Sequence, residues 1–349
     1  MMKHRPIVGV DLGGTNINIG IIDDTGRLVG GSRVNKKTQA AQGTAVVIDR
    51  IAAAIRESMD GAELSVRQIG GIGIGAAGAV DTARGVVIKG GNLGFTNVPL
   101  ATAIQRKIGG NARVTVENDV NAAVYGEWKH PRGSIYGVQE AAGVWIGTGV
   151  GGGLVLSGKL YSGGFFTAGE VGHMTLFPGA PLGRRSVEQN CSRTAIGDRL
   201  LALIASGQRS ELKAMVEEEK RQLLEKARKD VKDKGKLSWQ FESNKLLRSK
   251  SISESYADQD ELTRAVIDEA AVLLGTCIAG VVTLLSLPHV VLGGGLTEAL
   301  GEPWVKAVRT ATRSQVFPDS CKRVDVVGTT LKDLAGIIGA ALLARDSRR

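Results

Sequence analysis

The sequence has few of the side chains that would crosslink a small protein or present a stacking surface. Its three cysteines, Cys191, Cys277 and Cys321, are far apart and form no CxxC pair. This spacing supports neither a disulfide framework nor a cysteine-based zinc site. Aromatic residues make up only 4% of the chain, which argues against stacked aromatic platforms. What remains is an ordinary globular composition over 349 residues, long enough for about two domains.

The sequence also gives no sign of a segment directed to a membrane. No signal-peptide-like apolar stretch precedes the strand predicted at residues 7–11. The longest apolar run, residues 270–287, is interrupted by Gly275, Gly280 and several hydroxyl side chains. Such a run is more typical of a buried helix than of a transmembrane helix. We therefore expect a cytoplasmic protein with no membrane partner.

The net charge of +9 is concentrated in one segment. Residues 209–250 hold 13 basic and 8 acidic side chains, so five of the nine net charges lie there. Opposite charges mixed at helical spacing mostly stabilise a solvated helix surface, whereas a phosphate track needs one sign of charge. We expect a charged helical insertion at the surface, at about residues 208–256, and no nucleic-acid partner.

Glycine is abundant, with 48 residues, and two glycine turns share one pattern. Apolar runs at residues 7–11 and 16–22 flank Leu12-Gly13-Gly14-Thr15, and a third strand is predicted at residues 28–34. The same strand, turn and strand recur at residues 142–156, around Gly147-Thr148-Gly149. Turns between apolar runs predict hairpins, and glycine lets backbone N–H groups approach an anion closely. The repeat predicts two related lobes that face a shared cleft.

Asp11 ends the first strand, so it would lie near an anion held by the first turn. A carboxylate there could hold a hydrated Mg²⁺ ion. A third glycine turn, Gly293-Gly294-Gly295, lies between a strand and a helix. It could accommodate an adenosine group against the backbone, or it could only make the turn. No GxxxxGK[ST] sequence occurs and no GxGxxG opens a helix, which disfavours the P-loop and Rossmann folds.

Two further polar groups have the chemistry of a substrate site. Asn118 and Asp119 stand where the strand at residues 114–117 meets a helix, and ligands bind at such strand ends in α/β sheets. Asp119 could accept a proton from a substrate hydroxyl, or either residue could only cap the helix. Glu170, His173 and Glu188 could hydrogen-bond the hydroxyls of a polyol, although His173 could equally be structural.

Together these motifs resemble the ROK family of sugar kinases, within the actin/hexokinase/Hsp70-like ATPase superfamily. Residues 10–16 are similar to its first phosphate motif, 147–153 to its second and 293–295 to its adenosine motif. Residues 117–119 and 170–174 are similar to its sugar and catalytic motifs. The resemblance covers the chain apart from the charged insertion.

The resemblance implies an α/β fold of two ribonuclease H-like lobes flanking an interdomain cleft. Residues 1–122 would form the N-terminal lobe, joined by a C-terminal helix at 331–349, and residues 123–330 the C-terminal lobe. It also implies an ATP-dependent hexose kinase that phosphorylates the 6-hydroxyl of a sugar such as glucose. ATP and Mg²⁺ would be the cofactors, and a homodimer is common in the family.

The same resemblance assigns the site residues. Asp119 would be the general base. The sugar would be bound by Gly78, Asn92, Asn118, Asp119, Glu170, His173 and Glu188. The nucleotide would be bound by Asp11, Gly13, Gly14, Thr15, Asn16, Gly147, Thr148, Gly149, Gly293, Gly294 and Gly295. Asp11 would hold Mg²⁺ through water.

The chain departs from the family in two places: Ala77 stands where family members often carry a proline, and the zinc-binding motif CxCGxxGCxE is missing. In its place stands the shorter Gly183-Arg184-Arg185-Ser186-Val187-Glu188. We expect no zinc, and Glu188 is assigned by a remnant of the motif only. Fructose, N-acetylmannosamine or N-acetylglucosamine as acceptor, and polyphosphate as donor, therefore stay open. A non-catalytic sugar sensor is less expected, because such regulators carry a winged-helix domain before the first strand, which here begins at Ile7.

Overall fold

The computed structural model describes residues 5–110, 112–234 and 246–347, and its two five-stranded sheets have one topology. The first sheet has the order β3 (Val34–Lys37), β2 (Asn16–Ile22), β1 (Ile7–Leu12), β4 (Gly71–Ala76) and β8 (Val114–Asn118). The second has the order β11 (Lys159–Tyr161), β10 (Val150–Leu156), β9 (Ala141–Ile146), β12 (His289–Gly293) and β13 (Asp325–Gly328). In each sheet three antiparallel strands are followed by two parallel ones. The predicted α/β class and the repeat of the hairpin are confirmed.

The third strand of the first sheet begins later than predicted. The sequence predicts it at residues 28–34, but the strand runs from Val34 to Lys37, and Leu28 makes only an isolated bridge to Ile22. Between them Gly30 and Gly31 form a turn, with Gly31 at a φ of 73°. A left-handed glycine interrupts an extended strand, so pairing resumes only after the turn.

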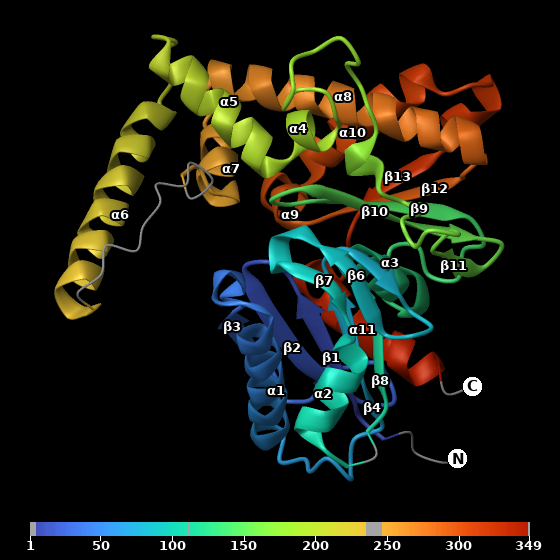
Figure 1. Cartoon of the computed structure of the whole chain (residues 1–349). Coiled ribbons are helices and arrows are strands. Elements are labelled where there is room, and N and C mark those ends of the chain that lie inside the picture. Colours follow the sequence, from blue (N-terminus) through green and yellow to red (C-terminus); the bar gives the residue numbers. More distant parts are fainter. Residues whose placement is uncertain (1–4, 111, 235–245, 348–349) are drawn as a thin grey trace.

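Helices cover each sheet. Helices α1 (Thr44–Gly61) and α2 (Leu100–Ile108) pack on the first sheet. Helices α8 (Glu261–Leu285), α9 (Gly295–Leu300) and α10 (Glu302–Gln315) pack on the second. A small sheet of β5 (Ala79–Asp81), β6 (Val86–Gly90) and β7 (Phe95–Val98) lies beside the first sheet. Figure 1 shows the two halves one above the other. Apolar side chains from these elements fill a separate core in each half.

Helix α8 is the predicted buried helix. It is long and apolar enough to cross a membrane, but 56% of its most apolar window is buried inside the protein. Ala271, Leu274, Ile278 and Val282 on this helix belong to the second core. Its hydrophobicity is therefore accounted for by packing within the protein.

Two helices, α3 (Asp119–Lys129) and α11 (Ala335–Asp346), pack against each other between the sheets (Figure 1). Their backbones come very close, because a Cβ atom on Gly339 would lie 1.7 Å from the carbonyl oxygen of Ala122. A Cβ atom on Gly9 of β1 would lie 2.0 Å from the carbonyl oxygen of Ile337. Only glycine permits this approach, which brings the N-termini of both helices to the ends of β1 and β8. The division into lobes 1–122 and 123–330, with 331–349 joined to the first, stays a proposal.

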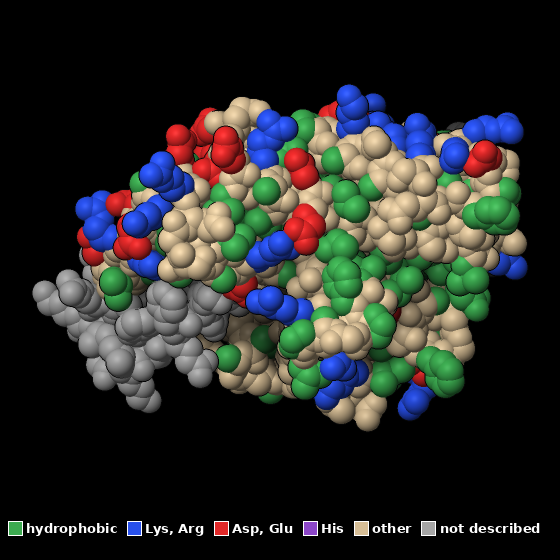
Figure 2. Space-filling model, turned by 90° about the horizontal axis from the view of Figure 1, so that it is seen from above, with side chains coloured by type: hydrophobic (Ala, Val, Ile, Leu, Met, Phe, Trp, Pro, Cys, Tyr) green, Lys and Arg blue, Asp and Glu red, His purple; other side chains and the backbone are tan. Residues whose placement is uncertain are grey.

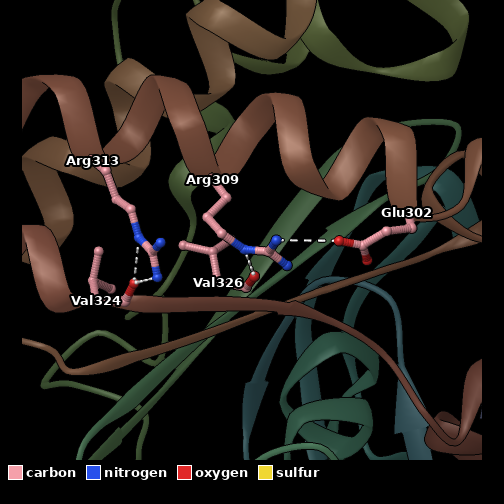
Figure 3. A network of polar contacts seen from close by, with 5 residues as sticks. All are labelled: Glu302, Arg309, Arg313, Val324 and Val326. Carbon is pink, nitrogen blue, oxygen red and sulfur yellow. Dashed lines mark hydrogen bonds and ion pairs between the residues drawn. The ribbon is translucent and has the colours of Figure 1, made fainter.

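The outer edge of the second sheet is covered by arginines of α10 (Figure 3). Arg309 donates from Nε to the carbonyl oxygen of Val326 at 2.7 Å, and its guanidinium also pairs with Glu302 at 3.1 Å. Arg313 donates to the carbonyl oxygen of Val324 at 2.9 and 3.0 Å. These bonds satisfy carbonyl groups on the free side of β13, which protects an edge strand from pairing with another chain.

The charged insertion is only partly a surface segment. Helix α6 (Leu212–Lys234) extends from the body of the molecule, as predicted (Figure 1). The base of the insertion, where it joins the body, is not a surface segment. Its residues Leu212, Val216, Leu247 and Ile252 are buried in the second core. Helix α7 (Ser249–Ala257) packs against α9. At this end Lys, Arg, Asp and Glu side chains lie intermingled (Figure 2), which agrees with a solvated face rather than a track of one charge.

Candidate active site

A cavity of about 910 Å³ lies between the two sheets, where the β1–β2 and β9–β10 hairpins face each other. Sixteen of the eighteen predicted site residues line it. They are Asp11, Gly13, Gly14, Thr15, Asn16, Gly78, Asn92, Asn118, Asp119, Gly147, Thr148, Gly149, Glu170, His173, Glu188 and Gly294. Residues separated by almost 300 positions in the chain therefore converge on one space.

The first hairpin loop is held from outside the cavity by Thr38. Its Oγ1 donates to the carbonyl oxygen of Gly13 at 2.7 Å, and its N–H donates to that of Thr15 at 2.9 Å. On the cavity side the loop touches Asn92, since a Cβ atom on Gly14 would lie 2.7 Å from the Asn92 Cβ. The first loop is thus fixed, and it adjoins the predicted sugar side.

The second hairpin loop is held by the N-terminus of α5 (Arg193–Ala205). Thr194 Oγ1 donates to the carbonyl oxygen of Thr148 at 2.8 Å, and the Arg193 N–H donates to that of Gly147 at 2.9 Å. Glu188 lies under this loop, because its Oε2 accepts from the Val150 N–H at 2.9 Å. A Cβ atom on Gly147 would meet open space. The backbone of this loop therefore faces the cavity directly.

Asn118 and Asp119 have different tasks in the structure. Asn118 is the N-cap of α3, with its Oδ1 accepting from the Asn121 N–H at 2.9 Å. Its Nδ2 donates to the carbonyl oxygen of Gly78 at 3.0 Å. Asp119 is the first residue of the helix, and its Oδ1 accepts from the Val120 N–H at 3.0 Å. Because Asn118 supplies the cap, the Asp119 carboxylate lines the cavity without being needed to start the helix.

Burial is the main cause that raises the pKa values of Asp11 and Asp119 in the cavity. Burial, then the nearby charges of Asp11 and Glu170, raise the pKa of Asp119 to about 7. Burial also raises the pKa of Asp11, against the hydrogen bond that Asn18 Nδ2 donates to its Oδ2 at 3.0 Å. The Asp11 carboxyl carbon would be 3.1 Å from a Cβ atom on Gly336, in the first turn of α11. The positive N-terminus of a helix stabilises the ionised form of a nearby carboxyl group. A bound divalent cation would stabilise the ionised form further.

Glu170 precedes a 3₁₀ helix at Val171–His173, and His173 is the last residue of that helix. The Glu170 Oε2 and His173 Nε2 atoms are 3.9 Å apart. Burial raises the pKa of Glu170, and the charge of Glu188 adds to that effect while His173 opposes it. After this helix the chain forms a loop in which Thr175 and Ser186 pair as an isolated antiparallel bridge. Ser186 belongs to the segment that stands where the family has its zinc motif. These groups combine hydrogen-bond donors and acceptors on one wall of the cavity.

The third glycine turn, at residues 293–295, meets the cavity at one residue. Of its three glycines only Gly294 lines the cavity. Gly293 is covered by the indole ring of Trp145, whose Cε2 would lie 2.3 Å from a Cβ atom on that glycine. Gly295 begins α9 and has only Ser249 Oγ near its Cβ position, at 3.9 Å. The absence of a side chain at Gly293 therefore makes room for the indole ring of Trp145.

Sequence reasoning missed several lining residues, among them Asn18, Lys89, Trp145 and Thr167. Trp145 could have been found, because it stands two residues before the second glycine loop as Asp11 stands before the first. Lys89, on β6, is the one lysine or arginine among the described residues that line the cavity. Nothing in its sequence neighbourhood points to that position.

The comparisons with known proteins agree with this geometry. The sequence profile of the ROK family matches residues 7–347. The glucokinase of Halalkalibacterium halodurans is 28% identical over 348 residues, 99% of this chain and 96% of that protein. The glucokinase of Thermotoga maritima is 28% identical over 347 residues and is matched over 99% of both chains.

A solved structure is also similar, that of a ROK family glucokinase from Streptomyces griseus in complex with glucose and AMPPNP. It is 27% identical and superposes with a TM-score of 0.77, covering 98% of this chain and 99% of that one. The predicted fold of two ribonuclease H-like lobes, of the actin-like ATPase type, is thereby confirmed. With a family profile that spans almost its whole length, this protein belongs to the ROK family.

Proposed function

We propose that this ROK sugar kinase transfers the γ-phosphoryl group of ATP to the 6-hydroxyl of a hexose such as glucose, with Asp119 as general base. The observation that carries the proposal is the Asp119 carboxylate in a cavity formed by two glycine hairpins. A base with a pKa of about 7 is half ionised near neutral pH, where general bases are most effective. The relatives named glucokinase support the choice of acceptor.

Several groups of the chain suit the sugar. Asn92, Glu170, His173 and Glu188 line the cavity together with the Gly78 and Asn118 backbone and amide groups. Fixed acceptors and donors of this kind can pair with several hydroxyl groups at once, which discriminates a polyol from analogues that lack one. Held in this way, a hydroxyl next to Asp119 would be aligned for transfer of its proton.

The nucleotide side fits ATP and Mg²⁺. The backbone of Gly147 faces open space, and that of Gly13 has no other atom within 3.4 Å of its Cβ position, so both loops can approach an anion. Asp11 is a half-buried carboxylate on the cavity wall, suited to hold Mg²⁺ through water, and Gly294 would adjoin the adenosine. When bound, Mg²⁺ neutralises charge on the transferring phosphoryl group. The protein's part is to hold the two loops and exclude water.

The test is a coupled kinase assay with a panel of hexoses and N-acetyl amino sugars, each with ATP and with polyphosphate. We expect the highest kcat/KM with glucose, ATP and Mg²⁺, and loss of activity with EDTA. A preference for fructose or an N-acetyl amino sugar would overturn the acceptor assignment, and a preference for polyphosphate the donor assignment. Binding without turnover of any sugar would instead indicate a sensor.

Three companion proposals concern the state of the protein in the cell. We propose a cytoplasmic enzyme that acts as a homodimer and holds no zinc. Size-exclusion chromatography with light scattering tests the homodimer, since a dimer has twice the mass of the 36.6 kDa chain. Elemental analysis of the purified protein tests for zinc, and one zinc ion per chain would contradict the proposal.

A further inference from the structure

At the end of α3 opposite Asp119 lies a second carboxylate, Glu127, which the proposed chemistry does not use. Its side chain is fully buried. Oε2 accepts from the Ser134 N–H at 2.7 Å, from Ser134 Oγ at 2.9 Å and from Thr330 Oγ1 at 3.1 Å. Oε1 accepts from the Leu331 N–H at 2.9 Å and from Thr329 Oγ1. Four uncharged donors, and the Thr330 hydroxyl whose one proton is shared with another acceptor, therefore surround one buried carboxylate.

These donors come from the two segments through which the chain passes between the sheets. Residues 130–140 lead from α3 to β9 in the second sheet. Residues 329–334 lead from β13 back to α11. The two crossings also contact each other directly, because the Thr330 hydroxyl lies 2.6 Å from the carbonyl oxygen of Arg132 and shares its one proton between that oxygen and Glu127 Oε2. Glu127 thus joins both crossings to the helix that begins with Asp119.

The carboxylate suits this task better than an amide would. Hydrogen bonds to an ionised acceptor are shorter and stronger than those between neutral groups, and burial makes each lost partner costly. Each oxygen also accepts one backbone N–H, from Ser134 at Oε2 and from Leu331 at Oε1. A hydroxyl donor can reverse its role, but a backbone N–H cannot. Glutamine would therefore turn an N–H group toward an N–H group at one crossing or the other.

We propose that Glu127 is a positioning residue that clamps both crossings, so that movement of one sheet relative to the other is transmitted through α3 to Asp119. Glu127 and Asp119 are eight residues apart on one helix, a distance of roughly 12 Å at the usual rise per residue. A helix is stiff over that length. Closing of the cleft on a sugar then moves the two crossings as one unit and carries the base with them.

The test compares Glu127→Gln with Tyr125→Phe. Tyr125 OH donates to Asp346 Oδ2 at 2.8 Å, a bond between α3 and α11 that does not involve Glu127, so this variant is a matched control for lost stability. The measurements are the melting temperature, kcat and KM for the sugar, ATP hydrolysed per sugar phosphorylated, and the radius of gyration by small-angle scattering. Glucose with Mg·ATP is the probe, or the hexose that the wild type turns over fastest.

We expect Glu127→Gln to lower kcat/KM by about 10²-fold, since small misplacement of a reacting group has effects of this size. It should also raise wasteful ATP hydrolysis and abolish the compaction that the sugar induces in the wild type. Tyr125→Phe should lower the melting temperature while leaving these three properties near the wild type. Wild-type kcat/KM and compaction in a destabilised Glu127→Gln would overturn the proposal, and so would a wild type that does not compact.

Two milder variants cover the case in which Glu127→Gln fails to fold. Ser134→Ala removes one hydroxyl donor from the first crossing and keeps the Ser134 N–H bond. Thr330→Val removes the bonds to Glu127 and to Arg132 from the second. Each should weaken the sugar-induced compaction, and the double variant should weaken it further. Unchanged compaction in the double variant would contradict the clamp whatever sugar the enzyme prefers.

Discussion

The two sheets carry the same hairpin at the same place, but the residue beneath each hairpin differs. In the first sheet this residue is Asp11, which stands two residues before Gly13 and pairs with Gly75 of the neighbouring strand. In the second sheet it is Trp145, which stands two residues before Gly147 and pairs with Gly293 of the neighbouring strand. Both side chains line the cavity. One position in a repeated fold thus holds a carboxylate on one side and an indole on the other.

This difference separates the work of the two halves. Asp11 and Asp119 both come from the first sheet or the helix that follows it, so the proposed metal site and base lie on one side of the cleft. The second sheet supplies Trp145 and the backbone of the loop at Gly147–Gly149. The Trp145 indole is an apolar surface on the cavity that also holds these carboxylates, which helps keep water away from them. A shared topology therefore does not require a shared role.

The largest effect is expected from Asp119→Ala. We expect kcat to fall about 10³-fold, because general base catalysis contributes factors of this order. The variant should fold, since Asn118 and not Asp119 caps α3. Steady-state kinetics together with circular dichroism measure both properties. A folded variant that turns over at nearly the wild-type rate would refute the assignment of the base.

Asp11→Asn should have the next largest effect. An amide keeps the size of the side chain but removes the charge that would hold hydrated Mg²⁺. We expect kcat/KM for Mg·ATP to fall about 10²-fold, with a higher Mg²⁺ concentration needed for half-maximal rate. A magnesium titration of the rate measures this. An unchanged magnesium requirement would remove Asp11 from the metal site.

The third expectation concerns the dependence of the rate on pH. Asp119 must be ionised to accept a proton, and its pKa is raised to about 7. The rate constant kcat/KM should therefore fall about tenfold per pH unit on the acid side of that value. Bound Mg²⁺ favours the carboxylate, so the midpoint lies at pH 7 or below. A rate that stays constant from pH 8 down to pH 5 would contradict a buried base.

The same burial should make Asp119 costly for the stability of the ligand-free protein. Its pKa rises from 3.8 to about 7 on folding, so the folded state binds the proton more tightly. This contribution to stability is complete below pH 3.8 and is lost as the pH rises through 7. Above pH 7 this loss amounts to about 4 kcal/mol relative to the protonated protein, an upper bound.

Asp119→Asn should therefore raise the melting temperature in EDTA at pH 8 and change it little at pH 3.5. Scanning calorimetry or fluorimetry at both values measures the difference. A variant that is equally or less stable than the wild type at pH 8 would show that the carboxylate is not costly to bury.

Trp145→Phe should have the smallest effect on turnover. The ring still covers Gly293, and no charge is lost, so we expect kcat/KM within about threefold of the wild type. Intrinsic fluorescence should lose the change that nucleotide binding causes, because this indole lines the cavity. A loss as large as that of Asp11→Asn would show that the indole shares the work of the carboxylate across the cleft.

Local sequence patterns predicted the elements correctly where the chain's own periodicity decides them. Both glycine hairpins, helix α8 and the charged helix α6 follow from apolar spacing and turn residues within short windows. The third strand was misplaced because Gly31, in a left-handed turn, was not recognised as an interruption. The buried base of the insertion was also missed, since Leu212 and Leu247 find their partners far along the chain.

The amino-acid sequence was enough to identify two related lobes, the glycine loops and the family, because these depend on patterns a few residues long. Only the tertiary structure separated Asn118 from Asp119, since the Asn118 amide meets the Gly78 carbonyl 40 residues away. Only the packing of Trp145 removed Gly293 from the cavity. The five partners of Glu127 likewise come from two distant segments. Contacts between remote residues depend on how the sheets and helices pack, which no local pattern encodes.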